Sequence, residues 1–378
     1  MTEIHSKERH KKSDIFVVKE LPFPSTLNPK LVQNWAKGIP LLSENDPDHP
    51  EWNATPTHEV QYKGRKILVK DESANPTGTM KDRPAWEMAC LYRDLARACL
   101  LKGLSESEIR QMSVPSLSII TSGNAGRAVA EVFKKYDLPP PRILIGEGTN
   151  EAIITELEKL YANIYRAELK SELSGKEILR LTNNTEGKDI TSDQTIEPQA
   201  VFYDWLAHEV FNQLDPNPEA QKHIYMPYGS GRLFESLLYW QVQSIKRHLQ
   251  GLSPDPRLKI DPMLLLRTSL HGAEPEQLDS KADKLTAPHK PFLIYQREEV
   301  KTCTPFQLTG DKTGVENFDE KHLEEAHRLF KEKGIKAEKS GAAGMALAIQ
   351  DIEEGRIGEE DQIIDINTGK GLLEKRII

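Results

Sequence analysis

Short apolar segments alternate with amphipathic segments along most of the chain from Lys66 onward. The apolar segments hold Ile, Leu, Val and aromatic side chains and are bounded by Gly, Pro or polar residues, a pattern typical of buried β-strands. We expect seven such strands: ILVK from Ile67, LSIIT from Leu117, RILIG from Arg142, HIYMP from His223, MLLLR from Met263, FLIYQ from Phe292 and QIIDI from Gln362.

Between these strands, apolar residues recur every three or four positions, which places them on one face of an α-helix. The clearest helices are AWEMACLYRDLARACLL from Ala85, GRAVAEVFKKY from Gly126, EAIITELEKLYA from Glu151 and FESLLYWQVQSIKRHL from Phe234. Helices that follow strands in this way cover the faces of parallel sheets. The pattern therefore predicts an α/β fold with mainly parallel sheets flanked by helices.

Local composition divides the chain into an arm and two lobes. Residues 1–58 are rich in Pro, Asp and Lys with few apolar anchors, so we expect an N-terminal arm. The polar stretch 168–199, rich in Ser, Thr, Asn and Gly, is typical of a linker. We therefore expect a large lobe formed by residues 59–81 and 168–378, with the arm packed on it, and a small mobile lobe formed by residues 82–167.

Charge and composition favour a small-molecule ligand. The 378 residues include 58 Asp and Glu against 50 Lys and Arg, for a formal net charge of −8, which disfavours a broad surface for nucleic acid or an anionic membrane. No apolar run approaches the ~20 residues that span a bilayer. Three Cys are too few for a disulfide framework, so we expect a cytoplasmic location. The His residues show no metal-binding spacing, so we expect no metal.

Three loops of small residues each connect a predicted strand to a predicted helix. The first, NPTGTMKDRP (75–84), places Lys81 at the start of a helix. The second is TSGNAGRA (121–128), and the third is PYGSGRLF (227–234). Small residues let backbone N–H groups at a helix start converge on a carboxylate or a phosphate. The three loops are therefore candidates for a site that combines an amine with anion binding.

Each loop also has a plain structural interpretation. A single Lys on a turn is usually solvated, and a Gly-rich string is usually only a turn. The third loop lacks the GxxxxGK[ST] pattern of nucleotide-binding P-loops. It also lacks the third Gly of the dinucleotide-binding pattern, because Phe234 stands there. A nicotinamide enzyme is therefore disfavoured.

In order and spacing, the three loops resemble those of the pyridoxal-phosphate enzymes of the tryptophan synthase β fold type, nearest to threonine synthases and threonine dehydratases. The resemblance runs from about Thr55 to Gly371. It includes EKSGAAGMALA from Glu338, which is similar to EPSGAAGLAA, and IIDINTGKG near the C-terminus, which resembles VVLTGxG. The resemblance implies pyridoxal 5′-phosphate as the cofactor, an amino acid as the substrate and a homodimer.

The resemblance also implies a role for each matched residue. Lys81 matches the Schiff-base lysine, Asn124 the residue that bonds the ring hydroxyl, and Thr368 the threonine that contacts the pyridine nitrogen. Lys81, once released from the cofactor, is the natural base for the α-proton. The 5′-phosphate is implied to bind at Gly229, Ser230, Gly231, Arg232 and Leu233. The substrate carboxylate is implied to bind at Thr121, Ser122, Gly123, Ala125 and Gly126.

Some matched positions depart from the family pattern. Met80 stands for the usual Phe, and Pro84 for Gly. Ala125 removes a hydroxyl that often bonds the substrate carboxylate or orients a second reactant. Thr195 stands where threonine synthases have an arginine that helps hold the substrate phosphate. These departures spare the groups needed to bind the cofactor but leave the substrate open.

The expected function is a pyridoxal-phosphate-dependent lyase or synthase that acts on a hydroxy- or O-phospho-amino acid by β- or γ-elimination or replacement, in the manner of a threonine synthase. A threonine or serine dehydratase and a cysteine synthase-like enzyme are alternatives. An alternative of another class is a sensor that binds the cofactor or a ligand without turnover. The presence of Lys81, Asn124 and Thr368 favours an enzyme.

Overall fold

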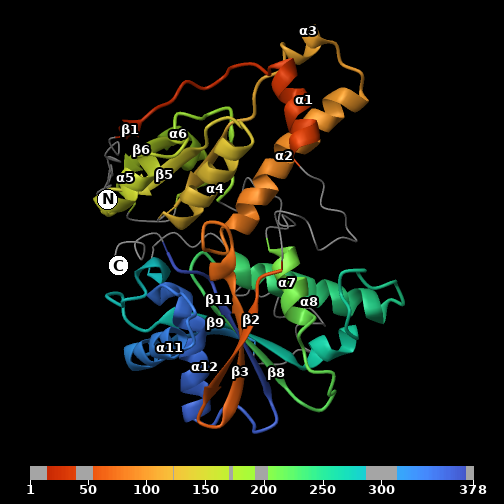
Figure 1. Cartoon of the computed structure of the whole chain (residues 1–378), viewed down its shortest axis with the longest axis vertical. Helices are drawn as coiled ribbons and strands as arrows, with labels where there is room; N and C mark the ends of the chain where they lie inside the picture. The colour runs from red at the N-terminus through yellow and green to blue at the C-terminus, as the bar shows by residue number, and fades with distance from the viewer. Residues whose placement is uncertain are drawn as a thin grey trace, which may run out of the picture.

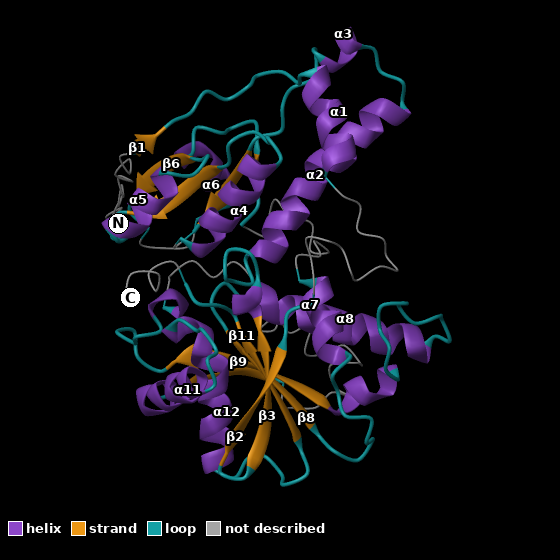
Figure 2. Ribbon diagram, viewed as in Figure 1, coloured by secondary structure: helices purple, strands orange, loops and turns teal. Residues whose placement is uncertain are grey.

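The computed structural model describes residues 15–39, 54–121, 123–169, 173–191, 203–286 and 313–371. These residues form two α/β lobes, the small lobe above the large lobe in Figure 1. Each lobe has its own sheet with helices packed against it (Figure 2). The expected two-lobed α/β fold is thereby confirmed. Within the described residues, no helix is long and apolar enough to cross a membrane.

The large lobe is built on a six-stranded sheet with the order β10-β9-β8-β11-β3-β2. All neighbouring strands are parallel except β2, which is antiparallel to β3 at the edge. The central strand β11 pairs with β3 on one side and β8 on the other. The strands are β2 (Thr57–Tyr62), β3 (Arg65–Asp71), β8 (Lys222–Pro227), β9 (Thr268–Pro275), β10 (Gly314–Phe318) and β11 (Gln362–Asn367).

Helices cover both faces of this sheet. Successive side chains of a strand point to opposite faces, and both faces of this sheet carry apolar side chains that the helices bury. Ile224 and Met226 of β8 pack into one core with α7 and α8, whereas Tyr225 between them packs into another core with α11 and α12. Figure 2 shows these two helix layers on either side of the strands. The helices are α7 (Asp204–Phe211), α8 (Arg232–Leu249), α11 (Glu320–Glu332) and α12 (Ala343–Glu353), with short 3-10 turns η1 (Glu72–Ala74), η2 (Pro262–Arg267), η3 (Asp283–Leu285) and η5 (Lys339–Ala342).

The small lobe is built on a five-stranded sheet with the order β1-β6-β5-β4-β7, in which β1 alone is antiparallel to its neighbour. Its strands are β1 (Phe16–Lys19), β4 (Leu117–Ile120), β5 (Arg142–Gly146), β6 (Asn163–Ala167) and β7 (Lys188–Asp189). Its helices are α1 (Pro29–Gly38), α2 (Asp82–Leu101), α3 (Glu106–Ile109), α4 (Asn124–Lys135), α5 (Glu151–Glu158) and α6 (Gly175–Leu181).

The described part of the N-terminal arm packs on the small lobe, which corrects the expectation that residues 1–58 pack on the large lobe. Strand β1 pairs with β6, with Phe16 opposite Arg166. Val32 and Trp35 of α1 are buried in the small-lobe core. Their helical spacing gives α1 one apolar face, and the neighbouring surface of α2 buries it. Residues 1–14 and 40–53 lie outside the described residues.

The boundary expected at residue 168 is also wrong, because the small lobe continues to about residue 190. Strand β7 pairs with β4, and Ile178 and Leu181 of α6 pack against the small-lobe sheet. The polar residues that predict a linker include Ser174 and Glu177, which form a capping box at the start of α6. Such residues begin helices as readily as they form loops, because they satisfy free backbone N–H groups.

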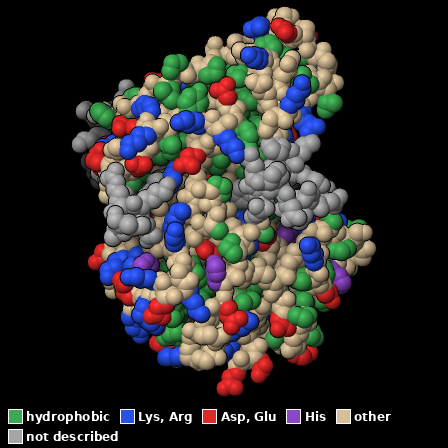
Figure 3. Space-filling model, in the orientation of Figure 1, with side chains coloured by type: hydrophobic (Ala, Val, Ile, Leu, Met, Phe, Trp, Pro, Cys, Tyr) green, Lys and Arg blue, Asp and Glu red, His purple; other side chains and the backbone are tan. Residues whose placement is uncertain are grey.

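Five of the seven predicted strands are confirmed as β3, β4, β5, β8 and β11. The segment from Met263 is instead the 3-10 turn η2, and the strand β9 follows it. The side chain of Asp261 accepts a hydrogen bond from Met263 N–H, and Pro262 favours a helical start, which explains the difference. The segment from Phe292 lies outside the described residues. On the face drawn in Figure 3, basic and acidic side chains are interspersed over both lobes.

Candidate functional site

A cavity of about 740 Å³ lies between the two lobes. It is lined by loops that follow strands β4, β8 and β11 and by the turn that begins α2. In α/β folds, ligands bind at this carboxyl edge of the parallel strands. The predicted site residues that line it are Lys81, Thr121, Asn124, Ala125, Gly229, Ser230, Gly231, Arg232, Leu233 and Thr368. Gly123 and Gly126 shape the second loop without lining the cavity, and Ser122 lies outside the described residues.

Lys81 lies where a hydrogen-bonded turn leads into α2. Gly78 has a φ of 86°, a conformation that glycine adopts readily. The carboxylate of Asp82 accepts a hydrogen bond from Thr77 N–H at 2.8 Å, and the Thr79 hydroxyl accepts one from Lys81 N–H at 3.0 Å. Burial raises the pKa of Asp82 to about 6 although its hydrogen bonds from Thr77 act in the opposite direction. The turn is thus fixed on both sides of Lys81.

The Lys81 turn is attached to the segment that follows β11. Met80 N–H donates to the carbonyl of Thr368 at 3.0 Å, and Thr79 forms an isolated β-bridge with Gly369. Gly369 has a φ of 131°, and a Cβ there would lie 2.5 Å from the carbonyl oxygen of Gly78. Only glycine therefore permits this close approach, which holds Thr368 beside the Lys81 turn.

The amine of Lys81 contacts a tyrosine that the sequence analysis missed. Lys81 Nζ donates to the hydroxyl of Tyr203 at 3.0 Å, and it lies 5.6 Å from the centre of the Tyr203 ring. Tyr203 is buried and lines the cavity. It lies just before α7, more than 100 positions from Lys81 along the sequence, and no motif includes it. Only the fold brings the two residues together.

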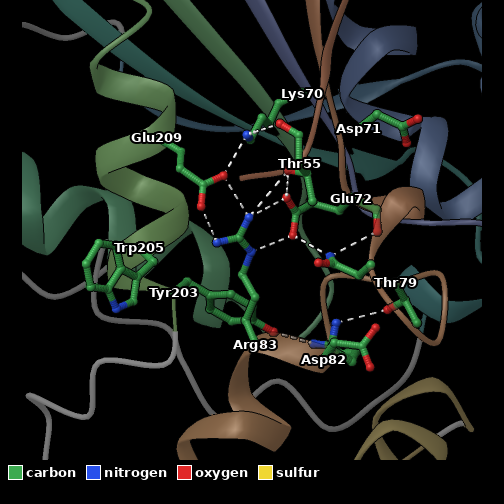
Figure 4. A network of polar contacts seen from close by, with 12 residues as sticks. Thr55, Lys70, Asp71, Glu72, Thr79, Asp82, Arg83, Tyr203, Trp205 and Glu209 are labelled. Carbon is green, nitrogen blue, oxygen red and sulfur yellow. Dashed lines mark hydrogen bonds and ion pairs between the residues drawn. The ribbon is translucent and has the colours of Figure 1, made fainter. Parts of the chain in front are cut away.

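A buried ionic network supports the start of α2 (Figure 4). Arg83 forms ion pairs with Glu72 at 2.6 Å and with Glu209 of α7 at 2.9 Å. Lys70 also pairs with Glu209 at 2.6 Å and donates to the carbonyl of Thr55 at 2.6 Å. Although burial opposes it, the charges of Arg83 and Lys70 hold the pKa of Glu209 below its ordinary value. The cations Arg83 and Lys70 thus neutralise the carboxylates of Glu72 and Glu209. These ion pairs join β3, α2 and α7.

The second loop brings Asn124 to the cavity at the start of α4. The Thr121 hydroxyl accepts a hydrogen bond from Gly123 N–H at 3.0 Å, and Gly123 has a φ of 135°. Asn124 Nδ2 donates to Glu338 at 2.8 Å. Its carbonyl oxygen Oδ1 is buried and has no hydrogen-bond partner within the described protein. A buried polar atom of this kind needs a partner, and a ligand in the cavity could supply one.

Opposite Asn124, the other cavity wall carries Glu338 and Lys284. The second carboxylate oxygen of Glu338 forms an ion pair with Lys284. Glu338 therefore connects a small-lobe residue, Asn124, with the large lobe across the cavity. In the sequence, Glu338 is only the start of the segment EKSGAAGMALA and carries no sign of this contact.

The third loop ends at the N-terminus of α8, the second-longest described helix. Gly231 is its N-cap residue with a φ of 84°, and it provides no side-chain cap. The first N–H groups of a helix have no partner within the helix and carry a partial positive charge. Because Gly229, Ser230 and Leu233 line the cavity here, this helix start can hold an anion. Arg232, at the same point, is buried.

The arrangement joins a lysine amine, an amide side chain and an anion-binding helix start in one cavity. An amine can bond to a carbonyl carbon, and the helix start can hold a phosphate. The size of the cavity suits a phosphorylated ring together with a small substrate, since ligand pockets of ~300–1,000 Å³ are typical.

The family model described as "Pyridoxal-phosphate dependent enzyme" matches residues 50–369. A search of curated protein sequences finds no match.

Solved structures with a similar fold include enzymes of several activities. Diaminopropionate ammonia lyase from Escherichia coli in complex with D-serine has a TM-score of 0.59 at 16% identity, covering 96% of this chain and 95% of that one. A pyridoxal 5′-phosphate-dependent aspartate racemase has a TM-score of 0.58 at 15% identity, and the match covers 95% of this chain and 99% of that one. O-ureido-L-serine synthase has a TM-score of 0.56 at 18% identity, and the match covers 88% of this chain and 93% of that one. At these identities the similarity establishes the fold.

Proposed function

Because the chain belongs to the family of pyridoxal-phosphate-dependent enzymes, we propose that it is a lyase or synthase that catalyses β- or γ-elimination or replacement on a hydroxy- or O-phospho-amino acid, in the manner of a threonine synthase. The observation that carries this proposal is the convergence of Lys81, the Asn124 loop and the α8 helix start on one cavity.

The residues of the cavity fit the cofactor group by group. The Lys81 amine would bond to the aldehyde carbon of the cofactor. Asn124, whose buried Oδ1 has no hydrogen-bond partner within the described protein, would accept a hydrogen bond from the ring hydroxyl. The α8 start, with Gly229, Ser230, Gly231, Arg232 and Leu233, would hold the phosphate. Thr368, whose carbonyl accepts a hydrogen bond from Met80 N–H of the Lys81 turn, would contact the ring nitrogen.

The bound cofactor withdraws electrons from the substrate Cα and so makes its substituents easier to remove. The protein supplies the remaining functions. Thr121, Ala125 and the N–H groups at the start of α4 receive the substrate carboxylate, with Ser122, Gly123 and Gly126 completing this loop. Lys81, when released by the substrate amine, accepts the α-proton at Nζ. The apolar side chain of Leu233, which is 3% exposed, forms part of the cavity wall.

A hydroxyl partner for the ring nitrogen favours elimination. The Thr368 hydroxyl cannot keep that nitrogen protonated as a carboxylate would. With Thr368 as the partner of the ring nitrogen, the site would favour loss of a leaving group over return of a proton to Cα. A threonine or serine dehydratase and a cysteine synthase-like enzyme share this feature and remain alternatives. The finer choice of a threonine synthase rests on the sequence resemblance.

The substrate class can be tested with the purified holoprotein and a panel of amino acids. O-phosphohomoserine should release phosphate and yield threonine if the threonine synthase proposal is correct. Threonine or serine should yield a 2-oxo acid and ammonia if the enzyme is a dehydratase, and O-acetylserine with sulfide should yield cysteine if it is a cysteine synthase. Lys81→Ala is the control that should abolish each reaction. Tight cofactor binding without any turnover would favour the sensor alternative.

A further inference from the structure

Tyr203 is the polar side chain in direct contact with the Lys81 amine. Within the described parts of the chain, Lys81 Nζ hydrogen-bonds to no other side chain, and the contact with the Tyr203 hydroxyl is 3.0 Å long. Tyr203 is 1% exposed, yet it lines the cavity. A buried hydroxyl that borders both an amine and a ligand cavity can pass a proton between the two.

The ionic network keeps this hydroxyl in position. Tyr203 precedes α7, and Glu209 of the same helix is held by Arg83 and Lys70. Arg83 is in turn two residues beyond Lys81 in α2. Figure 4 shows Tyr203 together with the ion pairs that Arg83 and Lys70 form with Glu209. The two helices that carry the amine and the hydroxyl are thus joined by buried charge.

Two other acidic groups near the cavity form no hydrogen bond with the Lys81 amine. Glu338 accepts a hydrogen bond from Asn124 and forms an ion pair with Lys284. Asp82 accepts a hydrogen bond from Thr77 N–H through Oδ2, and its buried Oδ1 has no hydrogen-bond partner. Among the described residues, the Tyr203 hydroxyl is the side-chain group that hydrogen-bonds to the Lys81 amine and can exchange a proton with it directly.

We propose that Tyr203 is a catalytic acid that relays a proton from Lys81 to a leaving hydroxyl group of the substrate; this role rests on the proposed function. The amine of Lys81 takes the proton from Cα and becomes an ammonium. As the carbon–oxygen bond breaks, its electron pair stays with the leaving oxygen, which takes the proton of Tyr203. The Lys81 ammonium then gives its proton to the Tyr203 oxygen. One proton leaves Cα and one reaches the leaving group, and both side chains return to their starting states.

This role makes the contribution of Tyr203 depend on the leaving group. Hydroxide is a poor leaving group, so threonine and serine need an acid when the carbon–oxygen bond breaks. Phosphate and acetate leave as stable anions, so their departure needs no proton from an acid. The hydroxyl of Tyr203 therefore matters for hydroxy-amino acids and matters little for their O-phospho- and O-acetyl derivatives.

The experiment compares Tyr203→Phe with the parent holoenzyme on serine, threonine, O-phosphoserine and O-acetylserine. Loss of a general acid should reduce kcat on the hydroxy-amino acids by about 10²–10⁴-fold, with changes of only a few-fold on the activated substrates. Tyr92→Phe is the matched control, because Tyr92 is a buried tyrosine of α2 whose hydroxyl donates to the carbonyl of Pro115. An equal loss on all four substrates, or no loss on any, would overturn the relay.

A second readout requires no turnover. The visible absorbance of the bound cofactor changes when the nitrogen of Lys81 loses its proton. Since the Tyr203 oxygen accepts a hydrogen bond from that nitrogen, Tyr203→Phe should lower the pH midpoint of this change by about half a pH unit or more. An unchanged midpoint would contradict the contact on which the relay depends. If the parent holoenzyme converts none of these four substrates and does not convert O-phosphohomoserine either, the proposed function fails, whereas the midpoint still tests Tyr203.

Discussion

Gly231 has a positive φ and also lies where a ligand would approach the first N–H groups of α8, and a residue with a side chain would be unfavourable on both counts. Its φ of 84° is unfavourable for a side chain, and it forms the N-cap of α8 at the cavity. Gly231→Val should therefore lose about 1–3 kcal/mol of folding stability through backbone strain. It should also weaken pyridoxal phosphate binding, because the added side chain blocks the approach of the phosphate to the helix N–H groups.

Gly251, just beyond the other end of α8, is a matched control for this change. It has a φ of 67° and open space around the position of a Cβ. Gly251→Val should show similar strain but normal cofactor affinity in a fluorescence titration of the apoprotein. If Gly231→Val binds the cofactor as tightly as Gly251→Val does, the third loop is only a turn.

Glu87 gives folding stability a dependence on pH. Burial raises its pKa to about 8, and the charge of Asp204 acts in the same direction. Between the ordinary value of 4.5 and about 8, the folded protein keeps a proton that the unfolded chain releases, so this carboxyl reduces stability as pH rises through that window. Glu87→Gln should increase the free energy of unfolding at pH 8 by an amount on the order of 2 kcal/mol.

Urea denaturation at pH 5 and pH 8 measures this effect. The exposed Glu106 of α3 is a suitable control, since Glu106→Gln should leave the pH dependence unchanged. An equal effect of Glu87→Gln at both pH values would show that its carboxyl is not protonated in the folded state.

At the scale of single residues, the sequence predicted positions inside motifs and missed those outside them. Lys81, Asn124 and Thr368 stand in loops with distinctive small residues, and all three line the cavity. Tyr203 stands in a stretch without such residues. Its contact with Lys81 depends on how the fold places the start of α7 near the start of α2, where Glu209 pairs with Arg83, and the local pattern does not contain this.

At the scale of secondary-structure elements, the network around Arg83 fixes how α2, α7 and β3 meet. Arg83→Met would leave Glu72 and Glu209 buried without their shared cation. Such uncompensated charge typically costs about 3–5 kcal/mol. Arg83→Met should therefore lower the midpoint of thermal unfolding and weaken the contact between Lys81 and Tyr203.

Arg328 provides the control for that substitution. It pairs with Glu325 and Glu332 on the exposed face of α11, where water screens the charges. Arg328→Met should leave the thermal midpoint nearly unchanged. A similar, small effect of both substitutions would mean that the buried pairs contribute little to stability.

Apolar runs predicted the buried parallel strands well because both faces of such strands are covered. Strands with interrupted apolar runs were harder to predict. Strand β6, which lies between β1 and β5, contains Asn163 and Arg166, and the edge strand β1 is only four residues long, so neither has a continuous apolar run. The segment from Met263 has such a run but begins with Asp261 and Pro262, which favour a helical turn. Local capping prevailed over hydrophobicity there.

At the scale of the whole molecule, residues of both lobes form the cavity. Lys81 and Asn124 lie at the starts of small-lobe helices, whereas the α8 start, Thr368 and Glu338 belong to the large lobe. The repeated strand–helix pattern predicted the α/β fold, and local composition, including the linker-like stretch 168–199, predicted two lobes. It could not assign the arm or the segment 168–191, because these pair with sheet edges that are distant in sequence.

The proposed function depends most directly on a covalent bond between Lys81 and the cofactor. The most direct test is to reduce the holoprotein with borohydride, which fixes the cofactor to the amine that holds it, and to identify the labelled peptide by mass spectrometry. The label should be found on Lys81, and Lys81→Ala should carry none. A label on Lys70, Lys284 or Lys370 in the unmodified chain would contradict the account.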